Sequence, residues 1–272
     1  MPLKKCCLFC LLLSLCQGFT MARNNLRFPD TRTLGMGGNG ASHSSLFNPA
    51  LLALQEQKDV RIDYFNRYGI KELATVSGAF CFPNRILPAG LHVASFGYDE
   101  YRESMFRLST GKRLNAFWTL GISVQYAVIQ SQLFESDASR LSTDIGASFQ
   151  PVDNCLITCS AINVPSISLN SEEVDSERIG TYLIELGVNW QLVNNLLITG
   201  SMAHNRETRW EASLGMEYRP YDDFHLRSGV RTAPFRPSLG AGYRFAGLIA
   251  DVVMIYHPVL GISTGLGLSF SF

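Results

Sequence analysis

Apolar residues alternate with small or polar residues over the last ten positions of the chain, STGLGLSFSF (263–272). One register holds apolar side chains and a single threonine, and the other holds only glycine and serine. A period of two kept over ten residues predicts a β-strand and excludes a helix, because successive side chains of a strand point to opposite faces. The same alternation returns in TYLIELGVNWQ (181–191), RWEASLGMEYR (209–219) and AFWTLGISVQYAV (116–128).

Fourteen such segments run from residue 59 to residue 272. From the middle of the chain onward, short connections such as PVDN (151–154) alternate with longer ones such as SQLFESDASR (131–140) and 164–180. This pattern predicts an up-and-down antiparallel meander whose two ends face different compartments. The segments centre near Ile62, Val76, Val93, Phe106, Ile122, Ile145, Thr158, Leu186, Gly200, Leu214, Gly229, Gly242, Val252 and Gly267.

The direction of the apolar face decides between a membrane barrel and a soluble all-β protein. Aromatic residues stand near both ends of several apolar faces, for example Trp118 with Tyr126 and Tyr182 with Trp190, and this spacing suits two interfacial girdles. The opposite face is rich in glycine and serine, which favours a confined lumen over a solvent-exposed surface. We therefore expect an all-β, 14-stranded antiparallel transmembrane β-barrel, with the soluble all-β protein as the alternative.

Closure of such a barrel is required, because no backbone group can stay unpaired in lipid. The first strand, near Ile62, is therefore expected to pair with the last, near Gly267. The chain ends on Phe272 with Phe270 two residues before it, and these aromatics resemble the signal that bacterial outer-membrane barrels present to their assembly machinery. The expected location is the bacterial outer membrane, with its lipid and the barrel assembly machinery as partners.

The first 22 residues have the pattern of a cleaved signal peptide. Lys4 and Lys5 precede the apolar stretch CCLFCLLLSLC (6–16), and small residues follow. Four of the seven cysteines lie in this segment, and the remaining three form neither a disulfide framework nor a metal site. The predicted organisation is a signal peptide (1–22), an N-terminal plug segment (23–58) and a transmembrane barrel (59–272).

The segment before the barrel does not alternate. It carries a glycine cluster with Gly35, Gly37 and Gly38, followed by Asn48 as a helix cap and Pro49 at the first helical position. The glycines suit tight passage of the backbone, and the short helix is expected to tuck apolar residues into the barrel mouth.

With TRTLGMGGNGAS (31–42), FNPALLA (47–53) and fourteen predicted strands, the chain resembles the FadL-like outer-membrane superfamily, nearest its PorV/PorQ branch. That branch is associated with type IX secretion in Gram-negative Bacteroidetes. The resemblance implies a short N-terminal helical plug containing Gly35, Gly37, Gly38, Asn48 and Pro49. It also implies a non-catalytic accessory or scaffold for protein secretion, with secretion-system proteins or exported cargo as partners. The alternative is a FadL-like passive transporter of small hydrophobic molecules.

Enzymatic chemistry is not expected. The five histidines are scattered, and neither a nucleophile motif nor a paired Cys/His motif is present, so we predict no cofactor and no metal. The net charge is zero, which gives no indication of nucleic-acid binding. Charged residues do recur on the inward register of consecutive strands, either as ion pairs that anchor the plug or as a polar conduit. They are Glu185, Arg209, Glu211, Glu217, Arg219, Arg227, Arg231, Arg244 and Asp251.

Overall fold

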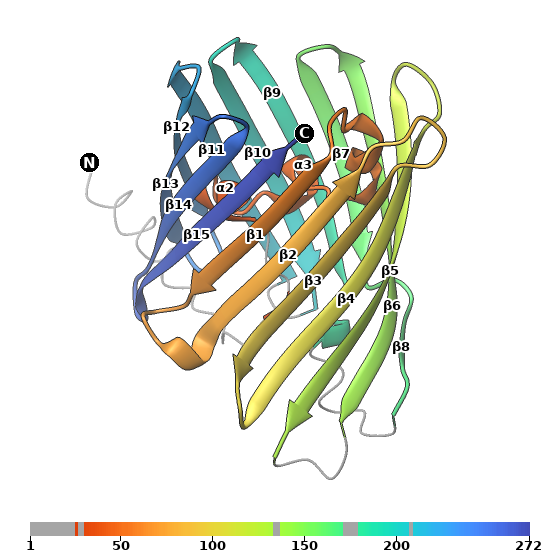
Figure 1. Ribbon diagram of the computed structural model, residues 1–272, viewed down its shortest axis with the longest axis vertical. Helices are drawn as coiled ribbons and strands as arrows, with labels where there is room; N and C mark the ends of the chain where they lie inside the picture. The colour runs from red at the N-terminus through yellow and green to blue at the C-terminus, as the bar shows by residue number, and fades with distance from the viewer. Residues whose placement is uncertain (1–24, 27–29, 133–136, 171–178, 207–208) are drawn as a thin grey trace, which may run out of the picture.

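The structure is a computed structural model that describes residues 25–26, 30–132, 137–170, 179–206 and 209–272. The predicted signal peptide (1–22) lies outside these residues. The described part is a closed β-barrel with short helices inside it (Figure 1). The ring consists of β1 (Asp59–Asn66), β2 (Ala74–Phe82), β3 (Ala89–Tyr98), β4 (Tyr101–Arg113), β5 (Trp118–Ser131), β6 (Ala138–Val152), β7 (Cys155–Ile162), β9 (Leu183–Val193), β10 (Leu196–Asn205), β11 (Arg209–Tyr221), β12 (Phe224–Arg231), β13 (Arg236–Phe245), β14 (Leu248–His257) and β15 (Gly261–Ser271).

Each of these fourteen strands in the described chain pairs antiparallel with its two neighbours. The ring closes where β1 pairs with β15, with Ile62 opposite Leu268 and Asp63 opposite Gly267. A fifteenth, three-residue strand, β8 (Ser166–Ser168), lies beside β6 and extends its edge. The predicted strand number and the predicted closure are both confirmed.

The apolar register faces outward. Ile62 is 59% exposed whereas its neighbour Asp63 is 2% exposed, and the same contrast repeats along the other strands. The soluble alternative needs the apolar face inside, and the structure has the opposite arrangement. Within the described residues, no helix is long and apolar enough to cross a membrane.

Tight turns gather at the end of the barrel where β1 begins and β15 ends (Figure 1). The turn between β13 and β14 is Ala246–Gly247, and both residues have positive φ (48° and 87°). Two left-handed residues match the twist of a two-residue hairpin, and glycine at the second position avoids strain there. β5 ends and β6 begins at the opposite end of the barrel, which we call the loop end.

The last residue of the chain is fixed at the seam of the barrel. The backbone N–H of Lys58 donates to the Phe272 carbonyl (3.2 Å), and the Phe272 N–H donates to the Lys58 carbonyl (2.9 Å). The Lys58 ammonium also lies 5.5 Å from the centre of the Phe272 ring and 5.3 Å from that of Phe82. The role of Phe270 and Phe272 in assembly stays a prediction, but in the folded barrel Phe272 closes the seam.

We expect Lys58→Met to weaken this seam, because a cation over an exposed aromatic ring contributes about 0.5–1 kcal/mol. The temperature at which the unboiled, faster-running band on an SDS gel converts to the unfolded band should fall by a few degrees. Lys112→Met is the matched control, since Lys112 is exposed at the same end of the barrel. An equal fall in both variants would contradict a specific role for Lys58.

Candidate functional site

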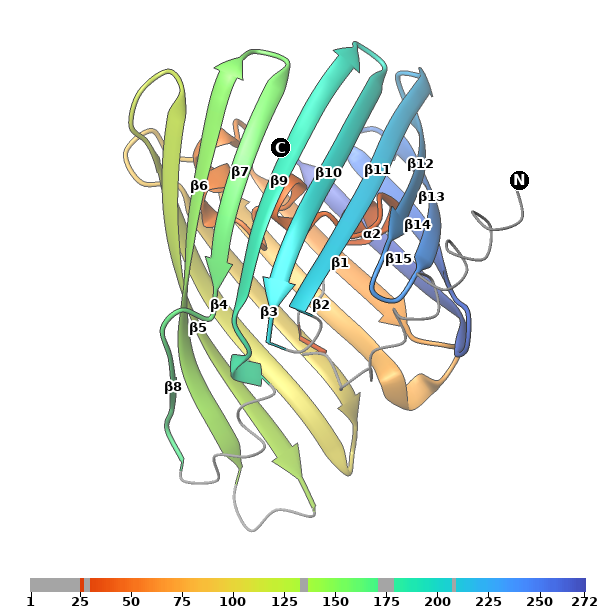
Figure 2. The same cartoon turned by 180° about the vertical axis from the view of Figure 1, so that it is seen from behind.

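Three short helices cross the lumen and form a plug nearer the end with the tight turns (Figure 2). They are α2 (Thr31–Gly35), α3 (Gly40–His43) and η1 (Pro49–Leu54). The helix η1 packs against β4, β5 and β6, α3 against β7, β9 and β10, and α2 against β12 to β15 and β1. The three plug helices therefore contact successive sectors of the inner wall, and together they reach most of it.

Local sequence explains where the plug helices begin. The Asp30 carboxylate accepts from the Thr33 N–H (2.9 Å) and caps α2. The Asn48 side chain accepts from the Ala50 N–H (3.1 Å), and Pro49 occupies the first position of η1, where no hydrogen bond is lost. The predicted cap and proline position are confirmed, in a 3₁₀-helix.

Glycines of the barrel wall allow the plug backbone to approach closely. A Cβ atom at Gly121 would overlap the backbone of Pro49 and Ala50, and one at Gly229 would overlap Gly37. Other inward glycines lie equally close to η1, to α3 and to the turn at residues 36–38. The bare face of the alternating pattern is thus a contact surface for main chain. Gly111 and Gly215 are further wall glycines of this kind, whereas Gly146 and Gly187 leave room for the side chains of Asn48 and Ser42.

The predicted plug glycines lie against β12 and β13. Gly37 and Gly38 have φ of +78° and +75°, the left-handed region that glycine adopts without strain. The Gly37 N–H donates to the Ser238 hydroxyl (3.1 Å), and Arg231 Nη2 donates to the Gly38 carbonyl (2.7 Å). Gly35 lies against Gly240 and the aliphatic part of Arg227.

A chain of ion pairs joins the plug to the wall beside α2. Arg32 donates through Nε and Nη2 to the two carboxylate oxygens of Glu217, both at 2.9 Å. Arg227 Nε donates to Glu217 (2.7 Å), and Arg227 Nη1 donates to Asp251 (2.6 Å). Glu217, Arg227 and Asp251 are buried, so each charge depends on its partners for stabilisation.

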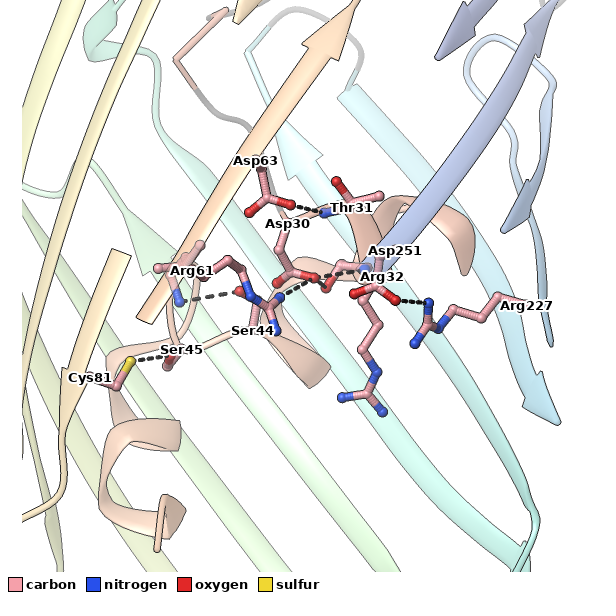
Figure 3. A network of polar contacts seen from close by, with 12 residues as sticks. Asp30, Thr31, Arg32, Ser44, Ser45, Arg61, Asp63, Cys81, Arg227 and Asp251 are labelled. Carbon is pink, nitrogen blue, oxygen red and sulfur yellow. Dashed lines mark hydrogen bonds and ion pairs between the residues drawn. The ribbon is translucent and has the colours of Figure 1, made fainter. Parts of the chain in front are cut away.

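A second set of contacts ties the start of α2 to β1 (Figure 3). The Asp30 carboxylate lies 2.9 Å from Arg61 Nη1, and the Thr31 N–H donates to Asp63 at 2.9 Å. None of these four residues is in the predicted charge network. Arg61 and Asp63 stand on the inward register of the first predicted strand, so the alternation of that strand could have identified them as lumen residues.

On the far side of the lumen, Arg107 of β4 holds the plug. Its guanidinium donates to the Leu46 carbonyl and to Gln125 Oε1 (2.6 Å from Nη2), and its Nε lies 3.3 Å from Asp144. Arg107 is buried and was not predicted, because the alternation is weak along this strand. The plug is therefore anchored on opposite walls.

The structure brings together only part of the predicted network. Glu211 pairs with Arg231 (2.6 Å), and Glu185 is buried on β9. Arg219 and Arg244 are corrections: Arg219 donates to the Asn194 carbonyl in a tight turn, and Arg244 is exposed near the end of β13. Their register points inward, but they stand at the rim, away from the plug. The side chain of Arg209 lies outside the described residues.

Apolar side chains line the lumen on the loop-end side of the plug. They cluster on β3 to β6, where inward positions would otherwise be polar, and Leu26 fills the centre of the cluster at 2% exposure. We call this group the apolar seat. Its members are Ala94, Phe96, Met105, Ala127, Ile129, Ala138 and Ile179, and Leu26 packs among them as the occupant of the seat.

Cavities open on the other side of the plug. Two of them, of about 480 and 490 Å³, flank the end of η1 and share Gln55, Glu56 and Arg113. Among the described residues no group of His, Cys, Asp or Glu is arranged to hold a metal ion. The plug thus lies between a mouth with charged side chains, among them Glu56 and Arg113, and the apolar seat.

Solved outer-membrane channels have this architecture. The toluene transporter TodX of Pseudomonas putida is 13% identical, with a TM-score of 0.65 over 93% of this chain and 99% of that one. A Pseudomonas aeruginosa FadL homologue is 14% identical, with a TM-score of 0.57 over 93% of this chain and 98% of that one. No family model and no curated protein matches the chain. The protein has the fold of FadL-like outer-membrane channels, and the narrower PorV/PorQ likeness stays a prediction.

Replacing Glu217 by glutamine should loosen the plug. The change leaves Arg32 and Arg227 sharing a neutral amide, and breaking a buried ion pair on one side costs about 3–5 kcal/mol. We expect limited trypsin digestion of the folded protein to cleave after Arg32 faster than in the wild type. Glu56→Gln, an exposed plug residue, is the control and should digest like the wild type. Unchanged protection in Glu217→Gln would show that the ion pairs do not hold the plug.

Proposed function

We propose that the protein is a non-catalytic, passive channel for small hydrophobic molecules in the bacterial outer membrane. The observation that carries this function is the apolar seat on the loop-end side of the plug. Elsewhere in the lumen the side chains that hold the plug are polar, charged or absent, as at Glu217, Arg107 and Gly121. An apolar patch offers a dissolved hydrophobic molecule a favourable site inside an otherwise polar lumen.

The fold supports the same proposal. TodX is described as a toluene transporter and, in a further structure, as a monoaromatic hydrocarbon channel. Within the described residues, no feature favours an accessory role in protein secretion over transport. Outer-membrane lipid and the barrel assembly machinery remain the proposed partners.

Filling the apolar seat should reduce uptake. Ala127 is 1% exposed inside β5, and Ala127→Phe places a ring where a ligand would lie. We expect cells carrying this variant to accumulate the fluorescent probe N-phenyl-1-naphthylamine at a rate near that of cells without the protein. Val128→Phe, one residue further and facing lipid, is the matched control and should keep wild-type uptake. Both variants are first checked for the heat-dependent band shift of a folded barrel.

A disulfide can test whether the plug must move. Ser45 Oγ of the plug lies 3.6 Å from the thiol of Cys81 on β2, so Ser45→Cys brings two sulfur atoms within easy reach of a bond. We expect oxidised Ser45→Cys protein to transport the probe several-fold more slowly, and a reductant to restore the rate. Ser45→Cys combined with Cys81→Ser should be insensitive to oxidation. Full transport by the cross-linked protein would show that molecules pass without movement of this part of the plug.

A further inference from the structure

Asn25 and Leu26 occupy the loop-end side of the lumen as a small amphipathic ligand would. The Leu26 side chain lies in the apolar seat, where Ala94, Ala127 and Ala138 leave space for a branched aliphatic group or a single ring. Asn25 stands at the edge of the seat, where charged side chains begin.

The side-chain amide and the backbone carbonyl of Asn25 each have a hydrogen-bond partner on the barrel wall. Its side-chain amide donates to Glu103 Oε1 (2.8 Å), and its backbone carbonyl accepts from Arg67 Nη2 (3.1 Å). The Tyr101 hydroxyl donates to the same Glu103 oxygen at 2.9 Å. The edge of the seat thus offers one acceptor and one donor to a neutral polar group.

These side chains are held in place before any ligand arrives. The Arg67 guanidinium lies between the rings of Phe65 and Phe96, 5.4 and 5.0 Å from their centres, and donates to Thr75 Oγ1 at 2.6 Å. Glu103 is 3% exposed. A ligand that replaces Asn25 and Leu26 would therefore meet a fixed carboxylate and a fixed guanidinium, and little ordering cost remains.

We propose that this seat selects compact apolar molecules that carry one neutral hydrogen-bonding group, such as a phenol or an alcohol, over plain hydrocarbons. This inference rests on the proposed transport function. A plain hydrocarbon would fill the place of Leu26 but leave Glu103 and Arg67 without the groups that Asn25 supplies, and buried charges lose stability when a partner is removed.

The test compares 4-fluorophenol with 4-fluorotoluene, which differ only by a hydroxyl in place of a methyl group. Binding to the protein in lipid nanodiscs is followed by ¹⁹F NMR, and empty nanodiscs correct for partition into lipid. After this correction we expect 4-fluorophenol to bind about tenfold more tightly, the size of one hydrogen bond to a charged acceptor. Leu26→Ala should tighten binding of both molecules several-fold, because it vacates the seat.

Variants of Glu103 test whether this carboxylate causes the preference for 4-fluorophenol over 4-fluorotoluene. Glu103→Met removes the acceptor at similar size and should abolish the preference for 4-fluorophenol, because 4-fluorophenol loses its acceptor and 4-fluorotoluene no longer separates a carboxylate from Asn25. Glu103→Gln should restore part of the preference. Glu100→Met, on the exposed turn before β4, is the matched control. Equal binding of the two molecules by the wild type, or a preference that survives Glu103→Met, would overturn the inference and leave transport intact. Absence of binding together with absence of probe uptake would instead contradict the proposed function.

Discussion

Backbone closure is the constraint on which the rest of this structure depends. In lipid every strand must find a partner on both edges, so the chain has to return from β15 to β1. Closure fixes which face of each strand looks at lipid and which looks inward, because the side-chain period is two. Once Ile62 faces out, Arg61 and Asp63 must face in, and a lumen lined by charge and glycine follows.

The plug fills part of the lumen so created, and the wall glycines determine how closely its backbone can pack against the strands. A side chain at Gly121 or Gly229 would overlap the plug, so the wall is bare where main chain crosses it. Packing of the plug backbone against the wall backbone is close, but by itself it does not fix the position of the plug along the wall. Ion pairs supply the missing direction: Arg32 with Glu217 on one wall, and Arg107 with the Leu46 carbonyl on the other, fix the plug in one register.

The sequence predicted the ring more fully than the site. Alternation is local, so fourteen strands and the pairing of Ile62 with the last strand could be derived without any tertiary information. Alternation gives the face of a residue but not its depth along the barrel, which is why Arg219 and Arg244 were wrongly grouped with Glu217. It gives no information on the plug, which has no period, and so Arg32 was missed.

The position of the charges also separates the anchoring of α2 from the apolar seat. The ion pairs of Arg32 and Arg227 hold α2 against β11 to β14, whereas the apolar seat lies on β3 to β6, toward the loop end. Holding α2 and receiving a hydrophobic molecule therefore use different walls and different forces. A molecule entering the seat competes with Leu26 for apolar contact and leaves the Arg32–Glu217 pair intact. A molecule can thus displace Leu26 without breaking the ion pairs of α2, and under the proposed function its passage beyond the seat depends on the part of the plug that a Ser45–Cys81 cross-link would fix.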